Sequence, residues 1–236
     1  MIFDVFDDNP CSTPRERALR GVTRDNGMIT IIDYGMGNLR SVQKAFERLG
    51  VEATITADPA LVANADKVVL PGVGAIADMI AELNRAGMKE VVVETIRANK
   101  PFLGVCLGFQ ALFDWSEENG GTECLGIFPG SVKRFPESPK YVVPHMGWND
   151  LTFHMPDDPI SKGLSDGAYV YFVHSFRADT EPSCLVADTT YGIKIPALVR
   201  SPVLPVYGAQ FHPEKSHDTG MRILSNFNEI CKGNHV

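Results

Sequence analysis

Residues 102–110, FLGVCLGFQ, place a single cysteine between an apolar run and a segment with helical character. Gly104 and Gly108 lie two residues before and two residues after Cys106, the glycine-x-nucleophile-x-glycine spacing of a tight strand-to-helix turn. Such a turn lifts the side chain out of the sheet, and the N-terminus of the following helix would stabilise a thiolate. The backbone N–H of Leu107 would point at a developing oxyanion. The alternative is a cysteine that only fills the core, because free cysteine is among the most buried residue types.

A cysteine nucleophile needs a base, and the base needs a group that orients it. The stretch QFHPEKS offers both, because His212 and Glu214 stand on either side of Pro213, directly after an apolar run. Proline has a fixed φ and no N–H, so it suits a rigid strand exit, and alternation after the strand sends His212 and Glu214 to the same side. Read alone, the same residues equally suit an exposed polar turn. Metal binding is not expected, because two further ligands at suitable spacing are missing.

The stretch LPGVG, residues 70–74, ends another apolar run and offers the second donor that an oxyanion site needs. Gly72 and Gly74 allow the backbone around Val73 to approach a ligand closely. The alternative is a glycine-rich loop that only makes a tight strand-to-helix turn. Phosphate binding is not favoured, because neither GxxxxGKS, GxxxxGKT nor GxGxxG is present.

The elements that must position these residues alternate along the chain from Met28. Strands are predicted at 28–33, 52–56, 67–70 and 101–105, and helical segments begin near residues 38, 59, 75 and 107, with an interruption near residue 87. This alternation predicts an α/β fold, an open, mainly parallel sheet with helices on both faces, in which ligands bind beyond the carboxyl ends of the strands. Cys106 and the 70–74 loop both fall at that edge.

The second half of the chain is predicted to be rich in β-structure. Short β-type runs follow Gly126 at 131–135, 147–153, 169–176, 184–190, 195–199 and 206–211, and a helix over 219–232 ends the chain.

Composition limits the classes of protein to which the chain can belong. Its 236 residues suit one domain, assigned to 28–236, and the polar segment 1–27 is interpreted as a disordered N-terminal extension. A net charge of −7 without a Lys/Arg block argues against nucleic-acid binding, and no apolar run approaches the ~20 residues that span a membrane. The five cysteines are scattered and never spaced CxxC, so no disulfide framework or zinc site is expected, and a reducing cytoplasm is the predicted compartment.

Five motifs occur in the order found in class I glutamine amidotransferases, which the sequence resembles: PGVG, GVCLGFQ, PHMGWN, YFVHSF and QFHPEKS. Together with DYGMGNLRSV, the motif PHMGWN makes the sequence similar to one branch of that family, the glutaminase subunits of imidazole glycerol phosphate synthases. The resemblance extends from Met28 to about Phe227 and implies the flavodoxin-like sheet of the family.

The resemblance implies roles for individual residues. Cys106 corresponds to the nucleophile, His212 to the general base and acid, and Glu214 to the group that orients the histidine. Oxyanion and substrate contacts correspond to Gly72, Val73, Gly74, Leu107, Gln110, His174, Ser175 and Phe176, and a partner-facing surface corresponds to Asn38, Met146 and Trp148. Taken alone, YFVHSF suits a core strand and Trp148 suits core packing. The family more often has Tyr where Phe176 stands, so a hydroxyl is lost there.

The resemblance also implies a reaction and a partner. Glutamine is hydrolysed to glutamate and ammonia without a metal or cofactor, and the ammonia passes to a (β/α)₈-barrel synthase subunit in a heterodimer. That partner makes imidazole glycerol phosphate and an aminoimidazole carboxamide ribotide in histidine biosynthesis. Three alternatives remain open here: the same chemistry serving another synthase, such as one that aminates a polysaccharide precursor; a cysteine peptidase-like hydrolase; and a non-catalytic binding subunit.

Overall fold

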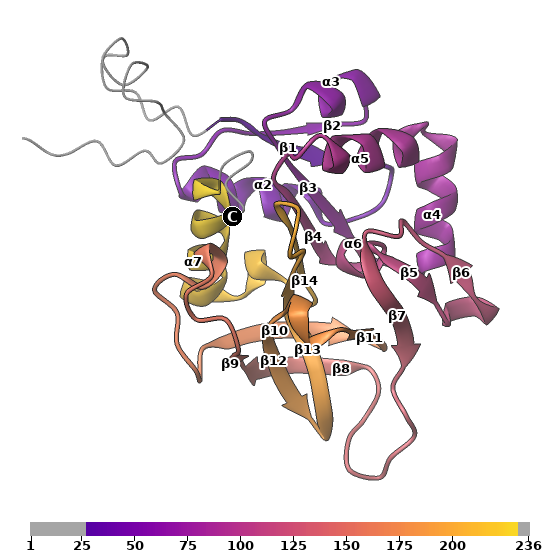
Figure 1. Cartoon of the computed structure of the whole chain (residues 1–236), viewed down its shortest axis with the longest axis vertical. Helices are drawn as coiled ribbons and strands as arrows, with labels where there is room; N and C mark the ends of the chain where they lie inside the picture. The colour runs from indigo at the N-terminus through magenta and orange to yellow at the C-terminus, as the bar shows by residue number, and fades with distance from the viewer. Residues whose placement is uncertain (1–26, 231–236) are drawn as a thin grey trace, which may run out of the picture.

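An eight-stranded sheet forms the centre of the molecule (Figure 1). The structure is a computed structural model that describes residues 27–230. Its strand order is β2-β1-β3-β4-β14-β13-β12-β9. The parallel part consists of β1 (Ile29–Ile32), β2 (Ala53–Thr56), β3 (Lys67–Gly72), β4 (Phe102–Cys106) and β14 (Val206–Ala209). The antiparallel extension consists of β13 (Ile193–Arg200), β12 (Leu185–Tyr191) and β9 (Thr152–Phe153). The predicted open, mainly parallel α/β sheet is confirmed.

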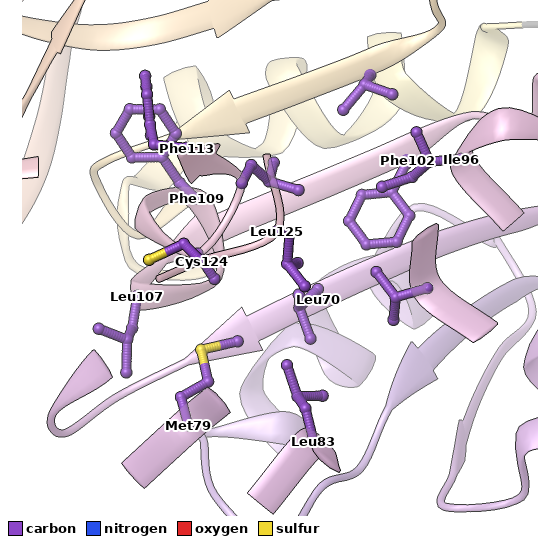
Figure 2. Close-up of a cluster of buried hydrophobic side chains, with 14 of the residues drawn as sticks. Leu70, Met79, Leu83, Ile96, Phe102, Leu107, Phe109, Phe113, Cys124 and Leu125 are labelled. Atoms are coloured by element: carbon purple, nitrogen blue, oxygen red, sulfur yellow. The ribbon is translucent and has the colours of Figure 1, made fainter. Parts of the chain in front are cut away.

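Helices cover both faces of this sheet, as predicted (Figure 1). One face carries α2 (Leu39–Arg48) and α7 (His217–Glu229), and the other carries α3 (Pro59–Asn64), α4 (Ile76–Arg85) and α5 (Met88–Arg97). Side chains of β3 alternate between the hydrophobic clusters on the two faces of the sheet. Val68 and Leu70 pack under α4 and α5, whereas Val69 packs under α2 and α7. Figure 2 shows the first of these clusters, in which Leu70 lies near Met79 and Leu83 of α4.

Local signals set the ends of several helices where the sequence predicts them. The carboxylate of Asp58 accepts a hydrogen bond of 2.8 Å from the backbone N–H of Ala60 and caps α3, with Pro59 at the first helical position. Gly87 adopts a left-handed conformation with φ of 64° and separates α4 from α5. The last helix begins at His217, two residues before the predicted start.

The helix predicted to start at Leu107 is much shorter than expected. It is the single turn α6 (Leu107–Gln110), and the chain then enters strand β5 (Phe113–Ser116), which the sequence did not predict. Residues 107–113 are all buried, so no helical period distinguishes a helix from a strand here. One turn carries little of a helix dipole, so a thiolate at Cys106 must be stabilised mainly by neighbouring side chains.

Two smaller sheets hold the β-rich segments. A four-stranded sheet has the order β11-β7-β5-β6 and consists of β11 (Phe176–Thr180), β7 (Phe128–Arg134), β5 and β6 (Thr122–Glu123). A two-stranded antiparallel ribbon pairs β8 (His145–Asp150) with β10 (Tyr169–His174). The single strands predicted over 147–153 and 169–176 are therefore each divided, at Leu151 and at Ser175.

The proposed domain boundary at residue 28 stays a prediction. The interpretation of segment 1–27 as a disordered extension falls on residues 1–26, which lie outside the described residues, and on Gly27. Within residues 27–230, every helix is too short or too polar to cross a membrane.

Candidate active site

Cys106 ends β4 in a backbone conformation that residues with a side chain rarely adopt. Its φ is 55° and its ψ is −109°, values that strain a residue carrying a Cβ. The flanking glycines are required by close contacts. A Cβ on Gly104 would lie 2.7 Å from the carbonyl oxygen of Gly108, and a Cβ on Gly108 would lie 1.8 Å from that of Leu70. The tight strand-to-helix turn predicted from the glycine spacing is present, with Cys106 at its apex.

Replacing Gly108 with alanine is expected to lower the free energy of unfolding by about 3 kcal/mol or more. The new Cβ would overlap with the carbonyl oxygen of Leu70 on the neighbouring strand β3. Gly50→Ala is the matched control, because Gly50 has a φ of 73° but no atom within 4 Å of its Cβ position, so only backbone strain of about 1 kcal/mol is added. Urea unfolding measures both variants. Equal losses in the two would contradict the contact argument.

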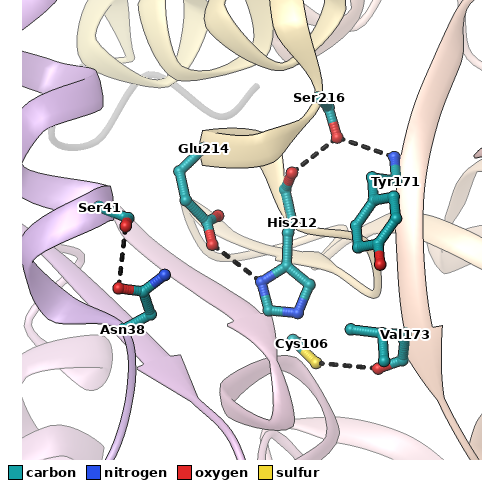
Figure 3. A network of polar contacts seen from close by, with 8 residues as sticks. All are labelled: Asn38, Ser41, Cys106, Tyr171, Val173, His212, Glu214 and Ser216. Atoms are coloured by element: carbon teal, nitrogen blue, oxygen red, sulfur yellow. Dashed lines mark hydrogen bonds and ion pairs between the residues drawn. The ribbon is translucent and has the colours of Figure 1, made fainter. Parts of the chain in front are cut away.

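His212 and Glu214 lie beside Cys106 on the turn that follows β14 (Figure 3). Nδ1 of His212 and Oε1 of Glu214 are 2.9 Å apart, and the two side chains are 4% and 2% exposed. Because an ionised carboxylate only accepts, Nδ1 carries a proton and Nε2 is left to exchange one with another group. Nε2 has no hydrogen-bond partner among the described residues and is turned toward Cys106. The predicted placement of His212 and Glu214 on the same side is observed.

Hydrogen bonds to β10 hold this turn. The backbone N–H of His212 donates to the carbonyl oxygen of Tyr171 at 3.0 Å. The hydroxyl of Ser216 donates to the carbonyl oxygen of His212 at 2.6 Å and accepts from the N–H of Tyr171 at 2.9 Å (Figure 3). Sequence reasoning did not single out Tyr171 or Ser216. Ser216 belongs to the QFHPEKS motif, but only the folded chain shows that it ties the turn to another strand.

Two neighbours determine the charge of His212. Burial lowers its pKa, but the neighbouring Cys106 and Glu214 raise it, and the resulting pKa is about 9 instead of 6.5. A histidine whose pKa is raised by an adjacent cysteine and carboxylate can form an ion pair with a thiolate. The arrangement therefore suits nucleophilic chemistry at Cys106.

We expect His212 to titrate near pH 9 in the wild-type chain and at lower pH in Cys106→Ala, because that variant loses one of the two groups that raise the pKa of His212. The folded pKa lies above the ordinary value. The stabilisation from this group is therefore complete below about pH 6.5 and is lost as the pH rises through about 9. NMR titration of the histidine ring protons measures both chains. A wild-type midpoint below 6.5, or equal midpoints in the two chains, would contradict the pairing.

The thiol is almost enclosed. Cys106 is 7% exposed, and its Sγ lies 3.9 Å from the carbonyl oxygen of Val173 on β10. The narrow space beside the triad has no room for a water-sized molecule and is lined by Asn38, Val42, Pro71, Gly72, Val73, Val105, His212 and Glu214.

The end of β3 lies against the cysteine turn. Gly72 is opposite Cys106 in the parallel pairing of β3 with β4. A Cβ on Gly72 would lie 2.9 Å from the backbone nitrogen of Gly108 and 2.9 Å from the Cβ of Leu107. The structure therefore brings Gly72 and Leu107, both predicted oxyanion residues, next to the thiol.

Val73 and Gly74 complete this loop. Gly74 has a φ of 95°, which a residue with a side chain would rarely adopt. The backbone N–H of Val73 lies near the hydroxyl of Tyr34, whose pKa is raised by burial and by Cys106 and lowered by this N–H. Tyr34 belongs to the DYGMGN stretch and was not singled out in the sequence. Its buried hydroxyl has no hydrogen-bond partner within the described part of the chain that meets normal geometry.

The predicted substrate-binding residues meet where β10 gives way to β11. Ser175 separates the two strands, with His174 ending one and Phe176 beginning the other. Nε2 of Gln110 donates to the carbonyl oxygen of Phe176 at 3.0 Å and to Oε1 of Gln210 at 2.9 Å. Both amide hydrogens of Gln110 are thus used by protein groups, which leaves its carbonyl oxygen for any contact with a substrate.

The predicted partner-facing residues lie at the surface near the triad. Met146 and Trp148 on β8 are 62% and 43% exposed. The ring of Trp148 stacks on that of His217 at the start of α7, with centroids 4.9 Å apart, so Trp148 is not a core residue. Asn38 is exposed, and its Oδ1 accepts a 2.9 Å hydrogen bond from Ser41 (Figure 3).

No group of three or more His, Cys, Asp or Glu side chains in residues 27–230 is placed to bind a metal ion. Cys106, Cys124 and Cys184 are free thiols and buried, and burial raises the pKa of Cys124 to about 12. The other two cysteines, Cys11 and Cys231, lie outside the described residues.

Comparison with known proteins gives three findings. The family model described as "Glutamine amidotransferase class-I" matches residues 30–230. Proteins named "Imidazole glycerol phosphate synthase subunit HisH" from Caldanaerobacter subterraneus and Syntrophotalea carbinolica are each 50% identical to this chain, over 87% and 86% of it and over 99% and 100% of their own lengths. The solved structure of PurLQS from Thermotoga maritima, 18% identical, superposes with a TM-score of 0.67 over 85% of this chain and 97% of that one, a likeness of fold.

Proposed function

The chain belongs to the class-I glutamine amidotransferase family, and on that premise we propose that it is the glutaminase subunit of an imidazole glycerol phosphate synthase in histidine biosynthesis. The family supports the reaction, which is hydrolysis of glutamine to glutamate and ammonia. The relatives that share half of its residues over nearly their whole length support the choice of synthase. The observation that carries the chemistry is the strained turn at Cys106 with the buried pair His212–Glu214 beside it.

The first half of the reaction uses the thiol as nucleophile. The proton of Cys106 moves to Nε2 of His212, while Glu214 holds the other ring nitrogen and stabilises the imidazolium. The thiolate attacks the side-chain carbonyl carbon of glutamine, and backbone N–H groups at Leu107 and in the 72–74 loop stabilise the oxyanion. When the tetrahedral intermediate collapses, the C–N bond breaks, His212 gives its proton to the leaving nitrogen, and ammonia departs from a γ-glutamyl thioester on Cys106.

The second half of the reaction regenerates the enzyme. Neutral His212 accepts a proton from water as the water oxygen attacks the thioester carbonyl. The C–S bond then breaks, the proton returns from His212 to the sulfur, and glutamate leaves. Every proton in both halves passes through Nε2, the histidine nitrogen that the structure leaves unpartnered within the described residues.

The ammonia requires a second subunit. Ammonia in neutral water is protonated and ceases to be a nucleophile, so a synthase must cover the site and take the product directly. The proposed partner is a (β/α)₈-barrel subunit in a heterodimer, and the proposed contact surface includes Asn38, Met146 and Trp148. The exposure of Met146 and Trp148 supports this, because exposed apolar side chains that lie together mark interaction sites.

Each of the three alternative functions considered from the sequence loses support for its own reason. Family membership removes support for a cysteine peptidase-like hydrolase. A strained cysteine beside a histidine–carboxylate pair is costly to maintain in a subunit that only binds. A synthase for another pathway is not favoured, because the relatives named above are both imidazole glycerol phosphate synthase subunits.

The experiment combines this chain with a (β/α)₈-barrel synthase subunit of the same organism. Gel filtration should show a one-to-one complex, and an assay of released glutamate should show glutamine hydrolysis by that complex. Met146→Asp together with Trp148→Asp should weaken the complex without changing the fold. A chain that neither binds the barrel nor hydrolyses glutamine in its presence would contradict the proposed function.

A further inference from the structure

The indole of Trp148 is partly exposed, yet it packs against two other rings. Trp148 lies on β8 and is 43% exposed. The imidazole ring of His217, at the start of α7, lies nearly parallel to the indole, with centroids 4.9 Å apart and planes 9° apart. The phenol ring of Tyr171 meets the indole edge-on, with centroids 5.8 Å apart and planes 64° apart. These are the stacked and edge-to-face geometries that aromatic rings prefer, and we call the three residues the indole clamp.

Hydrogen bonds fix the two rings that contact the indole relative to each other. Tyr171 lies directly opposite Trp148 in the antiparallel pairing of β10 with β8. The backbone N–H of Tyr171 donates to the hydroxyl of Ser216 at 2.9 Å (Figure 3). Its carbonyl oxygen accepts from the N–H of His212 at 3.0 Å. Because His217 follows Ser216 directly, both rings are attached to the turn that carries the catalytic histidine.

The backbone of His217 adopts a conformation that favours glycine. Its φ is 44°, in the left-handed region, at the first residue of the 13-residue helix α7. Such a conformation costs free energy and persists where the surrounding structure imposes it. Glycine would relieve this strain but would remove the ring that stacks on Trp148. The strained position therefore carries an exposed residue whose ring contacts an exposed indole.

An exposed indole that is already ordered suits a docking surface. Met146 is two residues before Trp148 on β8, so both side chains are on the same face of the strand, and Met146 is 62% exposed. Exposed apolar side chains that lie together mark interaction sites. A side chain that is held in place before binding loses less conformational entropy when a partner covers it. The indole clamp therefore increases the affinity for a partner that binds this patch.

We propose that His217 is a positioning residue for subunit docking, which holds the indole of Trp148 in the orientation that the (β/α)₈-barrel subunit binds. The identity of this partner rests on the proposed function, whereas the indole clamp rests on the ring contacts alone. His217 acts through the indole and not by a contact of its own with the barrel. Removal of its ring should therefore weaken docking only while Trp148 is present.

The indole clamp is tested in the full chain without a partner, by time-resolved fluorescence anisotropy. The chain has two tryptophans, so Trp115→Phe leaves Trp148 as the single reporter and serves as the reference. Adding His217→Ala should increase the fast local motion of the indole, and adding His217→Phe, which keeps a flat ring, should leave the anisotropy decay near that of the reference. Alanine and phenylalanine both carry a Cβ, so the backbone strain at a φ of 44° is the same in the two variants. An unchanged decay in His217→Ala would overturn the clamp.

The docking role is tested by calorimetric titration of the full chain with the barrel subunit. His217→Ala should raise Kd about three- to tenfold, the effect of one side chain that must be ordered on binding, and His217→Phe should keep Kd near the wild-type value. In a Trp148→Ala chain, His217→Ala should cause no further loss. An unchanged Kd in His217→Ala, or an equal loss with and without Trp148, would overturn the docking role. A wild-type chain that does not bind the barrel would refute the proposed function and the docking role with it, and the anisotropy result would still decide the clamp.

Discussion

Cys106→Ala is expected to lower glutamine hydrolysis by the complex on the order of 10⁶-fold, the loss seen when the nucleophile of a catalytic triad is removed. The synthase reaction with added ammonia should remain, because the proposed ammonia-using site lies in the other subunit. The fold should also remain, since alanine is smaller than the buried cysteine that it replaces and the strained turn at φ of 55° is already present. Released glutamate measures the first reaction, and product formation with ammonium salt measures the second.

Two further substitutions separate the members of the triad. His212→Ala should be as damaging as Cys106→Ala, because all proton transfers pass through its Nε2. Glu214→Ala should leave more activity, since the orienting residue matters less than the nucleophile or base. Cys184→Ala, at a buried free thiol that ends the short helical turn Pro182–Cys184 before β12, serves as the control. Glutamine-dependent activity that survives in Cys106→Ala would remove Cys106 from the mechanism.

Docking of the barrel subunit with its nucleotide ligand is expected to accelerate glutamine hydrolysis about 10²–10³-fold, the effect of one oxyanion donor. In the structure of the chain alone, the N–H of Val73 lies near the hydroxyl of Tyr34, and the space beside the triad admits no water-sized molecule. We expect the 72–74 loop to reorient so that the Val73 N–H leaves Tyr34 and points at the oxyanion. Gly74 lets the loop adopt more than one orientation, and a partner that favours the donor orientation switches the enzyme on.

The measurement compares glutamine hydrolysis by the chain alone, with the barrel, and with the barrel and a nucleotide ligand. Gly74→Ala should lower the accelerated rate more than the rate of the chain alone, because the added Cβ restricts the loop and meets Cε of Met36 at 2.8 Å. Gly167→Ala, at a positive φ of 85° with no atom within 4 Å of its Cβ position, controls for backbone strain elsewhere. Equal rates under all three conditions would refute gating but not the family assignment.

The elements that the sequence predicted well are those with local signals. Asp58 and Pro59 predict the start of α3, and Gly87 predicts the break between α4 and α5. The glycines around Cys106 predict the tight turn. The parallel strands β1, β3 and β4 are buried on both faces and consist mainly of apolar residues.

The elements that the sequence missed depend on contacts between distant segments. Strand β5 continues a buried apolar run that began as a helix, so no change of period marks its start. The break at Ser175 exists because β10 pairs with β8 while β11 pairs with β7. The contact between His145 and His174 follows from that pairing, 29 positions apart in the chain, and no spacing in the sequence indicates it. The sequence motifs thus predicted the reacting residues, whereas only the fold shows which contacts hold those residues in place.

In the proposed mechanism, Cys106 attacks glutamine and carries a γ-glutamyl thioester. The direct measurement is mass spectrometry of the chain in complex with the barrel subunit, quenched with acid during turnover of glutamine and digested with a protease. We expect the added mass of one glutamyl group on the peptide that contains Cys106, present in Cys184→Ala and absent in Cys106→Ala. A turning-over complex that carries no such adduct, or carries it on a different residue, would contradict this mechanism.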